Sequence, residues 1–549
     1  MSRAAGPKTP PASGPRTARR SGAGQAGAHE VVVGLEVHLA LRTHGKLFCG
    51  CRVAPGGEAT DVEPNVHVCP VCLGLPGALP VANAHALELA VRFASALGCQ
   101  VPSVTAFARK HYGYPDAPKN YQISQHDRPV GLGGALALPA PPAASHAGDA
   151  APRHIGIVRC HLEEDAGRLV HPTYADHSLV DLNRAGAPLI ELVTAPDLRS
   201  GTEARAFLEE VQALARALGV SDATPEEGKM RADVNVSLRL PGEPLGTKVE
   251  IKNLNSFRSA EAAIDSEATR QERLLAAGRA VLQETRGWNE GGQKSYLLRS
   301  KEEAADYRYL DDPDLPPIRL DAAWLAAVRA ATPPTPAELR RRYAGSGLKP
   351  EDAERLATDM ELARAFDALV AAAVATDAPA AGSAASTAAA GSAAAAAVVG
   401  DAGEPPAPQA LANWLLGEVV GWAHAAGRRL SDLRLTDPAG AGALAALVRL
   451  SEDGTISGPT AKALLPEVLQ GADPAALVEA RGLRQVSDAD ALARWVDEVL
   501  AAHPEAVDAA REQPKAVNFL MGRVMQASGG QARPDAVRTL LRARLGLDA

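Results

Sequence analysis

Val31-Val-Val-Gly-Leu-Glu-Val-His-Leu-Ala-Leu41 is the stretch that decides the fold of this chain. Apolar residues recur at every second position, which predicts a β-strand with one buried face. That face carries Val31, Val33, Leu35, Val37 and Leu39. Glu36 and His38 share the opposite face, because side chains two residues apart in a strand point the same way. A carboxylate beside an imidazole is half of a metal site or of an acid–base site.

Four cysteines follow this strand in two close pairs, Cys49-Gly-Cys51 and Cys69-Pro-Val-Cys72. Four thiolates in this arrangement are the ligand set of a closed, tetrahedral, structural zinc site. We therefore predict that Cys49, Cys51, Cys69 and Cys72 bind zinc, with free core cysteines as the alternative. The remaining two, Cys99 and Cys160, stand apart in the sequence and are expected to be small buried hydrophobic residues.

The size of the chain predicts two to four domains, because 549 residues exceed what one ordinary core supports. Six cysteines in such a length do not form a disulfide scaffold, and their close spacing favours a reducing compartment and a metal. No apolar run reaches the length that a membrane span requires.

The net charge of −8 is unevenly distributed. Residues 1–28 hold five basic and no acidic residues, lack an apolar core and contain four prolines. A secretory signal needs an apolar core, and a transit peptide needs an amphipathic helix, which the prolines oppose. We therefore predict that residues 1–28 are a disordered basic extension of a bacterial cytoplasmic protein. Residues 511–549 hold seven basic and three acidic residues, which fits a polyanion-binding tail or, equally, a solvated surface.

The hydrophobic pattern divides the rest of the chain into three parts. Residues 29–325 alternate like short strands, with helices predicted at 83–97 and 202–218. Residues 326–435 are helical and contain an Ala/Gly/Ser/Pro-rich insert at 374–407. Residues 436–549 form a small helical tail domain. The organisation predicts an α+β protein.

Several of the predicted strands are apolar on one face and carry acids, amides and bases on the other. A solvated sheet face is the simple explanation, but it is usually covered by Lys, Glu and Thr and not by repeated Asp, Glu, Asn and His. Oxygen-rich sites with an occasional imidazole suit Mg²⁺. The candidate ligands are Glu36, His38, Glu163, Glu164, Glu191, Asp233 and Glu250.

Two further patterns bear on nucleotides and RNA. The segment 287–295 is close to a phosphate-binding loop, but Gln293 occupies the position of the required lysine, so any nucleotide must be held through metal and carboxylates. A basic–aromatic patch could stack on bases or hold phosphates, although a packed surface loop is the commoner outcome. It comprises Arg109, Lys110, Tyr112, Tyr114, Lys119 and Tyr121.

These residues together resemble one family, the B subunits of aspartyl/glutamyl-tRNA amidotransferase. The resemblance covers about 29–549 apart from the Ala-rich insert. Its motifs include Gly34-Leu-Glu-Val-His38, Tyr114-Pro-Asp-Ala-Pro-Lys-Asn-Tyr121, His161-Leu-Glu-Glu-Asp-Ala-Gly167, Arg231-Ala-Asp-Val-Asn-Val-Ser237, Glu250-Ile-Lys-Asn-Leu-Asn-Ser256 and Ala412-Asn-Trp414. The chain departs from the family at Gly113 and Ala117, where relatives usually carry Phe and Leu.

The resemblance implies a cradle-shaped, largely antiparallel catalytic domain, then an all-α domain and a small all-α tRNA-binding tail. It also implies use of ATP and Mg²⁺ to phosphorylate the side-chain carboxylate of misacylated Glu-tRNA(Gln) or Asp-tRNA(Asn). Ammonia would come from an amidase-type glutaminase, the A subunit, and a small C subunit would complete a heterotrimer. A structural Zn²⁺ occurs in part of the family.

The family's metal and nucleotide residues correspond here to the seven candidate ligands, of which all but Glu191 are also expected to be catalytic. Lys252, Asn253 and Asn255 are expected to contact phosphate or the aminoacyl end of the tRNA. The alternative function is a zinc-stabilised tRNA-binding scaffold whose chemistry lies entirely in a partner.

Overall fold

The computed structural model describes residues 29–53, 62–139, 153–174, 176–300, 307–375, 405–485, 488–512 and 517–547. The predicted basic extension and most of the Ala-rich insert lie outside these residues. The described residues belong to two compact units. The first unit comprises residues up to Glu36, Ala195–Arg205 and Ala232–Ala305; the second comprises Val37–Thr194, Ala206–Arg231 and the chain from Asp306 onward.

Strand β1 (Glu30–Ala40) is the predicted strand, and it contributes to both units. Val33, Leu35, Val37 and Leu39 are buried, and Glu36 and His38 alternate with them as partly exposed residues, as predicted. The strand therefore presents its two polar side chains on one face of a sheet whose other face belongs to the core.

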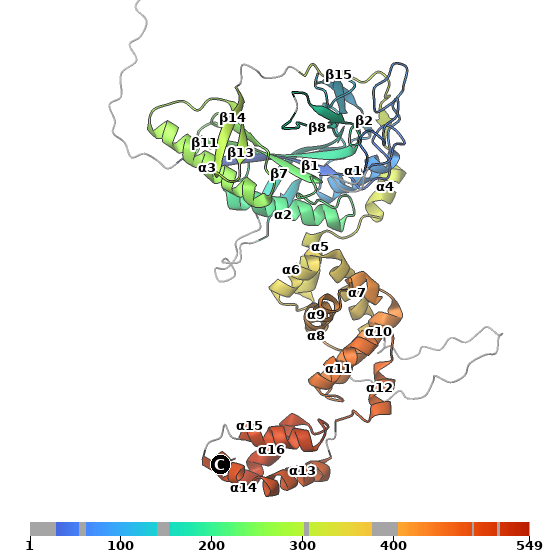
Figure 1. The fold of residues 1–549 in the computed structure, drawn as a ribbon, viewed down its shortest axis with the longest axis vertical. Coiled ribbons are helices and arrows are strands. Elements are labelled where there is room, and N and C mark those ends of the chain that lie inside the picture. Colours follow the sequence, from blue (N-terminus) through green and yellow to red (C-terminus); the bar gives the residue numbers. More distant parts are fainter. Residues whose placement is uncertain are drawn as a thin grey trace, which may run out of the picture. The chain divides into compact units, whose positions relative to one another are not determined.

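In the first unit, strands follow the order β14-β13-β12-β11-β1. Their bounds are β11 Met230–Arg239, β12 Val249–Lys252, β13 Glu284–Asn289 and β14 Lys294–Ser300. β11 and β12 pair antiparallel, as do β13 and β14, whereas β12 and β13 are parallel. Helix α3 (Phe257–Ala276), capped by Ser256, packs against β14 (Figure 1). The register sets Asn235 opposite Glu250 and so places polar side chains of β11 and β12 together.

In the second unit, the strand order is β1-β10-β7-β4-β3-β15. These strands are β3 Ala108–His111, β4 Tyr121–Ser124, β7 His154–Glu164, β10 Pro188–Thr194 and β15 Leu310–Asp311. The antiparallel pair β7 and β10 sets His161 opposite Glu191. The shorter strands are β2 Val104–Thr105, β5 Gly131–Leu132, β6 Ala135–Ala137, β8 Arg168–Val170, β9 Leu179–Asp181 and β16 Ile318–Arg319.

Helices support this sheet at the places that the sequence predicts. Helix α1 (Ala84–Ala96) begins at the N-cap Asn83, whose side chain accepts hydrogen bonds from the His85 and Ala86 amides. It packs against β7 and against α4 (Ala322–Ala330). Helix α2 (Gly201–Ala217) corresponds to the other predicted helix. The α+β class is thereby confirmed.

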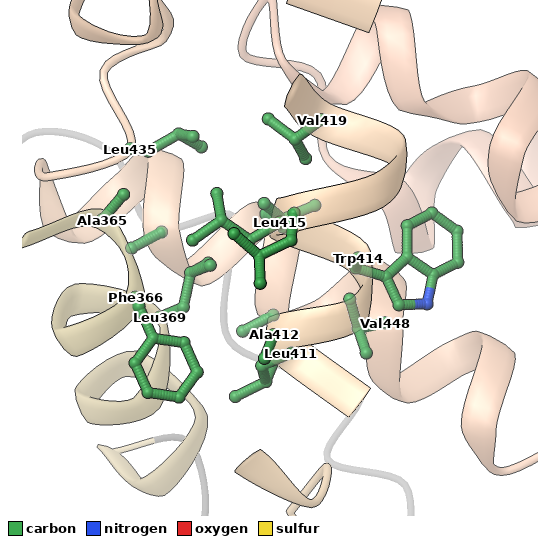
Figure 2. Packing of buried hydrophobic residues seen from close by; sticks show 14 of the residues in the cluster. Ala365, Phe366, Leu369, Leu411, Ala412, Trp414, Leu415, Val419, Leu435 and Val448 are labelled. Atoms are coloured by element: carbon green, nitrogen blue, oxygen red, sulfur yellow. The ribbon is translucent and has the colours of Figure 1, made fainter. Parts of the chain in front are cut away.

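The chain from Pro336 onward is helical, as predicted. Its helices are α5 Pro336–Gly345, α6 Pro350–Thr358, α7 Met360–Ala375, α8 Pro408–Asn413, the π-helix η3 Trp414–Val419, α9 Val420–Ala425, the 3₁₀-helix η4 Leu430–Leu433, α10 Pro438–Glu452, α11 Gly458–Val468 and α12 Pro474–Arg481. One buried cluster unites them: Figure 2 shows Phe366 and Leu369 with Leu411, Leu415 and Val448. The domain boundary expected at 435/436 falls inside this cluster, because Leu444 and Val448 of α10 join it.

A separate buried cluster runs from Leu492 to Leu545. It is built by α13 Ala489–Ala502, α14 Pro504–Glu512, α15 Val517–Ala527 and α16 Pro534–Leu545. Within the parts of the chain that are described, no helix is long and apolar enough to cross a membrane.

A buried ion pair joins α2 to α5 in the second unit. Arg340 donates to both carboxylate oxygens of Glu210, from Nη1 to Oε1 at 2.9 Å and from Nη2 to Oε2 at 2.7 Å. The Glu210 side chain is 4% exposed. Arg340 also donates to Glu354 on α6, at 2.6 Å from Nε to Oε2. The pair thus joins the first helix of the helical region to α2.

We expect Glu210→Gln to destabilise the protein, because breaking one side of a buried ion pair costs about 3–5 kcal/mol and Glu354 compensates Arg340 only in part. The measurement is the thermal unfolding midpoint, which should fall by roughly several degrees. The matched control is Glu209→Gln, the same change at an exposed neighbour in α2. Equal midpoints for the two variants would contradict this role.

Candidate active site

Three carboxylates from three strands meet in the first unit. Glu36 of β1, Asp233 of β11 and Glu250 of β12 each offer an oxygen within 4.8 Å of the others. Each lies on the polar face of an alternating strand, so the strand pairing alone brings them together. Three carboxylates at this separation repel one another unless a cation lies among them. We call this group the β1–β12 cluster.

Lys252 supplies positive charge to the β1–β12 cluster. Its Nζ lies 2.5 Å from Asp233 Oδ2 and 3.1 Å from Glu250 Oε1. Burial alone would lower the pKa of Lys252, but the two carboxylates raise it above its usual value. Burial alone would raise the pKa of Glu250, and Lys252 instead lowers it. Both groups are therefore held in their charged forms.

Neutral donors fix the other oxygens of the cluster. Asn235 Nδ2 donates to Glu36 Oε1 at 3.1 Å, and Thr285 Oγ1 donates to Glu250 Oε2 at 2.8 Å. Arg299 in turn donates from Nε to Thr285 Oγ1 at 3.2 Å. The carboxylates are thus oriented by residues that do not belong to the predicted set.

An open, polar cavity of about 150 Å³ adjoins Glu250. Lys248 and Arg299 bring positive charge to its lining, and Asn235 and Thr285 bring neutral polar groups. Cations beside a carboxylate cluster suit a ligand that is itself anionic and binds with a metal ion. Neither Lys248 nor Arg299 was among the predicted site residues, although Lys248 alternates with Glu250 and Lys252 on the polar face of its strand.

A second group lies in the second unit and contains His38 of β1, Glu163 of β7 and Glu191 of β10. His38 Nε2 lies 3.3 Å from Glu163 Oε1 and 3.4 Å from Glu191 Oε2. Burial alone would lower the pKa of His38, but the two carboxylates raise it to about 10. We call this group the β1–β10 cluster. Its protonated imidazole supplies a positive charge between two acids, as Lys252 does in the first cluster.

His161 also belongs beside the β1–β10 cluster. Its Nε2 lies 3.3 Å from Glu191 Oε2, the oxygen that faces His38. The side chain is 4% exposed, and its Nδ1 has no hydrogen-bond partner among the described residues. The two imidazoles hold the pKa of Glu191 well below its usual range against the effect of burial. His161 lies two residues before Glu163 and therefore shares its strand face, but it was not among the predicted ligands.

Glu164 does not join either cluster. Its two oxygens lie 2.5 and 2.6 Å from Lys119 Nζ, and Oε1 also accepts from the Ile123 amide at 2.8 Å. Consecutive residues of a strand point to opposite faces, so Glu163 and Glu164 of β7 cannot serve one cluster together. The structure separates this residue from the other six predicted ligands.

The predicted cofactor-binding residues divide in the same way. Lys252 lies in the β1–β12 cluster, whereas Asn253 and Asn255 are exposed in the turn between β12 and α3. Asn253 has a φ of 63°, a left-handed conformation that Asn tolerates better than most residues.

The four cysteines of the two close pairs lie together in the second unit. Cys49, Cys51, Cys69 and Cys72 each place a sulfur within 4.8 Å of the others. Hydrogen bonding from Cys49 contributes most to lowering the pKa of Cys72, to about 4. Cys99 and Cys160 are buried as expected, but they contact each other and so do not stand alone in the fold.

Aromatic and basic side chains gather around β3 and β4. Tyr112 and Tyr114 are exposed and stacked, with ring centres 5.5 Å apart. Lys110 Nζ lies 4.9 Å from the centre of the Tyr307 ring, and Tyr309 stacks on His126 at 4.1 Å. Burial alone would lower the pKa of Lys110, whereas the Glu163 and Glu191 carboxylates of the β1–β10 cluster raise it. Tyr307 and Tyr309 were missed because they are distant in sequence from the predicted patch, and His126, five residues after Tyr121, was not included in it.

Comparison with known proteins assigns the chain to a class. Residues 31–326 match the family model of the GatB/GatE catalytic domain, and residues 397–545 match that of the GatB domain. The B subunit of the aspartyl/glutamyl-tRNA(Asn/Gln) amidotransferase of Thermus thermophilus is 50% identical, over 94% of this chain and 100% of its own. Its counterpart in Deinococcus radiodurans is 48% identical over the same shares. The chain therefore belongs to the family of aspartyl/glutamyl-tRNA(Asn/Gln) amidotransferase B subunits, as its motifs indicated.

Proposed function

We propose that this chain uses ATP to activate the side-chain carboxylate of misacylated Glu-tRNA(Gln) or Asp-tRNA(Asn) for amidation in the bacterial cytoplasm. The observation that carries the proposal is the division of the polar sheet face into two acid clusters, each charge-compensated by a basic side chain. The names of the relatives supply the substrate class.

The chemistry requires an activated carboxyl group. A carboxylate is a poor electrophile at neutral pH, so its oxygen first attacks the γ-phosphorus of ATP, which forms an acyl phosphate and releases ADP. Ammonia then attacks the acyl carbon, and phosphate leaves to give the amide. The ammonia would come from glutamine hydrolysis in an amidase-type A subunit, which a small C subunit would hold to this chain.

The donor sets of both clusters fit Mg²⁺, which prefers carboxylate oxygens. Glu36, Asp233 and Glu250 would hold one ion, and Glu163 and Glu191, with His38 in its deprotonated form, would hold a second. Bound there, Mg²⁺ would neutralise phosphate charge during phosphoryl transfer.

The protein's own cations have complementary roles. Lys252, Lys248 and Arg299 would bind the phosphates of ATP, and Asn253 and Asn255 would orient the phosphate or the aminoacyl end. The stacked tyrosines and Lys110 would hold unpaired bases at the 3′ end of the tRNA. Arg523, Arg538 and Arg542 are exposed on α15 and α16 and would contact the tRNA backbone, whereas Arg544 pairs with Asp497 at 2.9 Å.

Cys49, Cys51, Cys69 and Cys72 fit a structural Zn²⁺, because four sulfurs without an open position form a closed site. The ion would stabilise the loop after β1 and take no part in the reaction.

The test uses the reconstituted heterotrimer and ATP labelled at the γ-phosphate. We expect release of labelled phosphate to require Mg²⁺ and Glu-tRNA(Gln), and to continue when the glutaminase of the A subunit is inactivated but ammonium chloride supplies the ammonia. Gln-tRNA(Gln) is the matched control, because its side chain has no carboxylate to phosphorylate. Phosphate release that stops with the glutaminase, or is equal with both tRNAs, would favour the scaffold function instead.

A further inference from the structure

Lys46 is a buried lysine that the proposed reaction does not use. It is 0% exposed, and no other lysine in the described part of the chain is buried to this extent. It lies three residues before Cys49, in the loop that follows β1. An ammonium group that is buried away from water requires an anion or several hydrogen-bond acceptors as partners. The partners of Lys46 therefore indicate its role.

Backbone hydrogen bonds and side-chain packing both fix the position of Lys46. Its backbone amide donates to the Cys51 carbonyl at 2.9 Å, and its carbonyl accepts from Asn83 Nδ2 at 3.2 Å. Gly186 covers the side chain: its φ of +85° favours glycine, and a Cβ there would lie 3.6 Å from Lys46 Cδ. The lysine is therefore a packed part of the structure and not a surface residue turned inward.

The ammonium group has one potential anion as a partner. Lys46 Nζ donates to Cys72 Sγ at 3.5 Å and to the Leu182 carbonyl at 3.3 Å. No carboxylate among the described residues lies within ion-pair distance of it. The Cys72 sulfur also accepts from the Cys69 amide at 3.2 Å, as a ligand sulfur in a zinc site does.

The net charge of the cysteine site indicates the role of Lys46. Four thiolates around Zn²⁺ carry a net charge of −2, and this charge lies at a site whose Cys72 is 6% exposed. We propose that Lys46 compensates the negative charge of the cysteine site by donating to the Cys72 sulfur, and that it thereby retains the zinc. The proposal rests on the zinc assignment above and is independent of the ATP-dependent reaction.

The same lysine links the cysteine site to the neighbouring segment 180–183. Its second acceptor, Leu182, donates its amide to Asn65 Oδ1 at 2.8 Å. Asn183 Oδ1 accepts from the His67 amide at 2.8 Å. The loop that carries Cys69 and Cys72 is thus attached to this segment by two hydrogen bonds between backbone amides and asparagine side chains, and by Lys46.

The experiment follows zinc loss from the full-length chain in its reconstituted complex, with excess colorimetric chelator. We expect one zinc per wild-type chain, and Lys46→Met should release it at least about 10-fold faster. Lys229→Met is the matched control, because Lys229 is also paired, with Asp222 and Glu227, but lies outside the cysteine site. Equal release from wild type and K46M overturns the role of Lys46, whereas a wild-type chain without zinc overturns the zinc assignment.

Two further variants separate charge from packing and guard against a folding defect. Lys46→Gln keeps a neutral N–H donor, so fast zinc release from K46Q supports charge compensation and wild-type release overturns it. If K46M fails to fold, K46Q is compared with wild type in a Cys72→Ser background. A smaller loss of thermal midpoint there than in the wild-type background supports the pairing of Lys46 with Cys72, and equal losses overturn it.

Discussion

Replacing Asp233 by asparagine is expected to lower ATP-dependent amide formation at least about 100-fold, because the variant loses a charged oxygen of the β1–β12 cluster. The side chains of aspartate and asparagine have nearly the same shape, so the substitution preserves the packing of β11. Lys252 remains paired with Glu250 at 3.1 Å, which keeps a compensated charge in the site. The measurement is the rate of Gln-tRNA(Gln) formation by the reconstituted heterotrimer with saturating ATP.

A matched control separates loss of charge from loss of a lysine partner. Asp222 accepts from Lys229 at 2.7 Å much as Asp233 accepts from Lys252, but it lies outside both clusters. Asp222→Asn should retain wild-type turnover, and both variants should bind the tRNA with wild-type affinity. Normal turnover in Asp233→Asn would remove this cluster from the reaction. Weakened tRNA binding would assign Asp233 to the substrate and not to ATP.

The sequence allowed the polar face to be predicted because a strand places alternate residues on one side. Glu36 and His38 lie on that face for this reason alone. Their division between two clusters could not be predicted, since it depends on which strands come next to β1. Asp233 and Glu250 follow Glu36 far along the chain, and the sequence contains no pairing register.

Glu164 shows the opposite limit of the same rule. Its neighbour Glu163 lies on the polar face of β7, as the alternation of a strand requires. Glu163 and Glu164 were nevertheless both predicted as metal ligands, because they are adjacent in one motif. The period of two separates them, and applying it strictly to β7 would have excluded Glu164 and included His161. Lys46 was beyond reach, because a lysine near cysteines in sequence is ordinarily exposed and only the closed loop buries it.

Glu191→Gln is the second substitution for which a large loss of activity is expected. Glu191 Oε2 lies 3.4 Å from His38 Nε2 and 3.3 Å from His161 Nε2, so one oxygen faces both imidazoles. An amide cannot accept from both and remain an anionic ligand. We expect amide formation at low Mg²⁺ to fall at least about 100-fold, since the β1–β10 cluster then keeps a single carboxylate, Glu163.

The dependence on Mg²⁺ distinguishes a metal ligand from a structural acid. If Glu191 helps to hold the ion, the Mg²⁺ concentration for half-maximal activity rises in Glu191→Gln, and excess Mg²⁺ recovers part of the rate. Glu88→Gln is the control: Glu88 also faces a histidine, His85 at 3.5 Å, but on the exposed side of α1. An unchanged Mg²⁺ requirement in Glu191→Gln, together with a lower thermal midpoint, would show that Glu191 stabilises the two imidazoles and binds no ion. A raised Mg²⁺ requirement with an unchanged thermal midpoint would show that Glu191 helps to bind the ion. The bound cation would then supply the positive charge that the proton on His38 supplies in its absence.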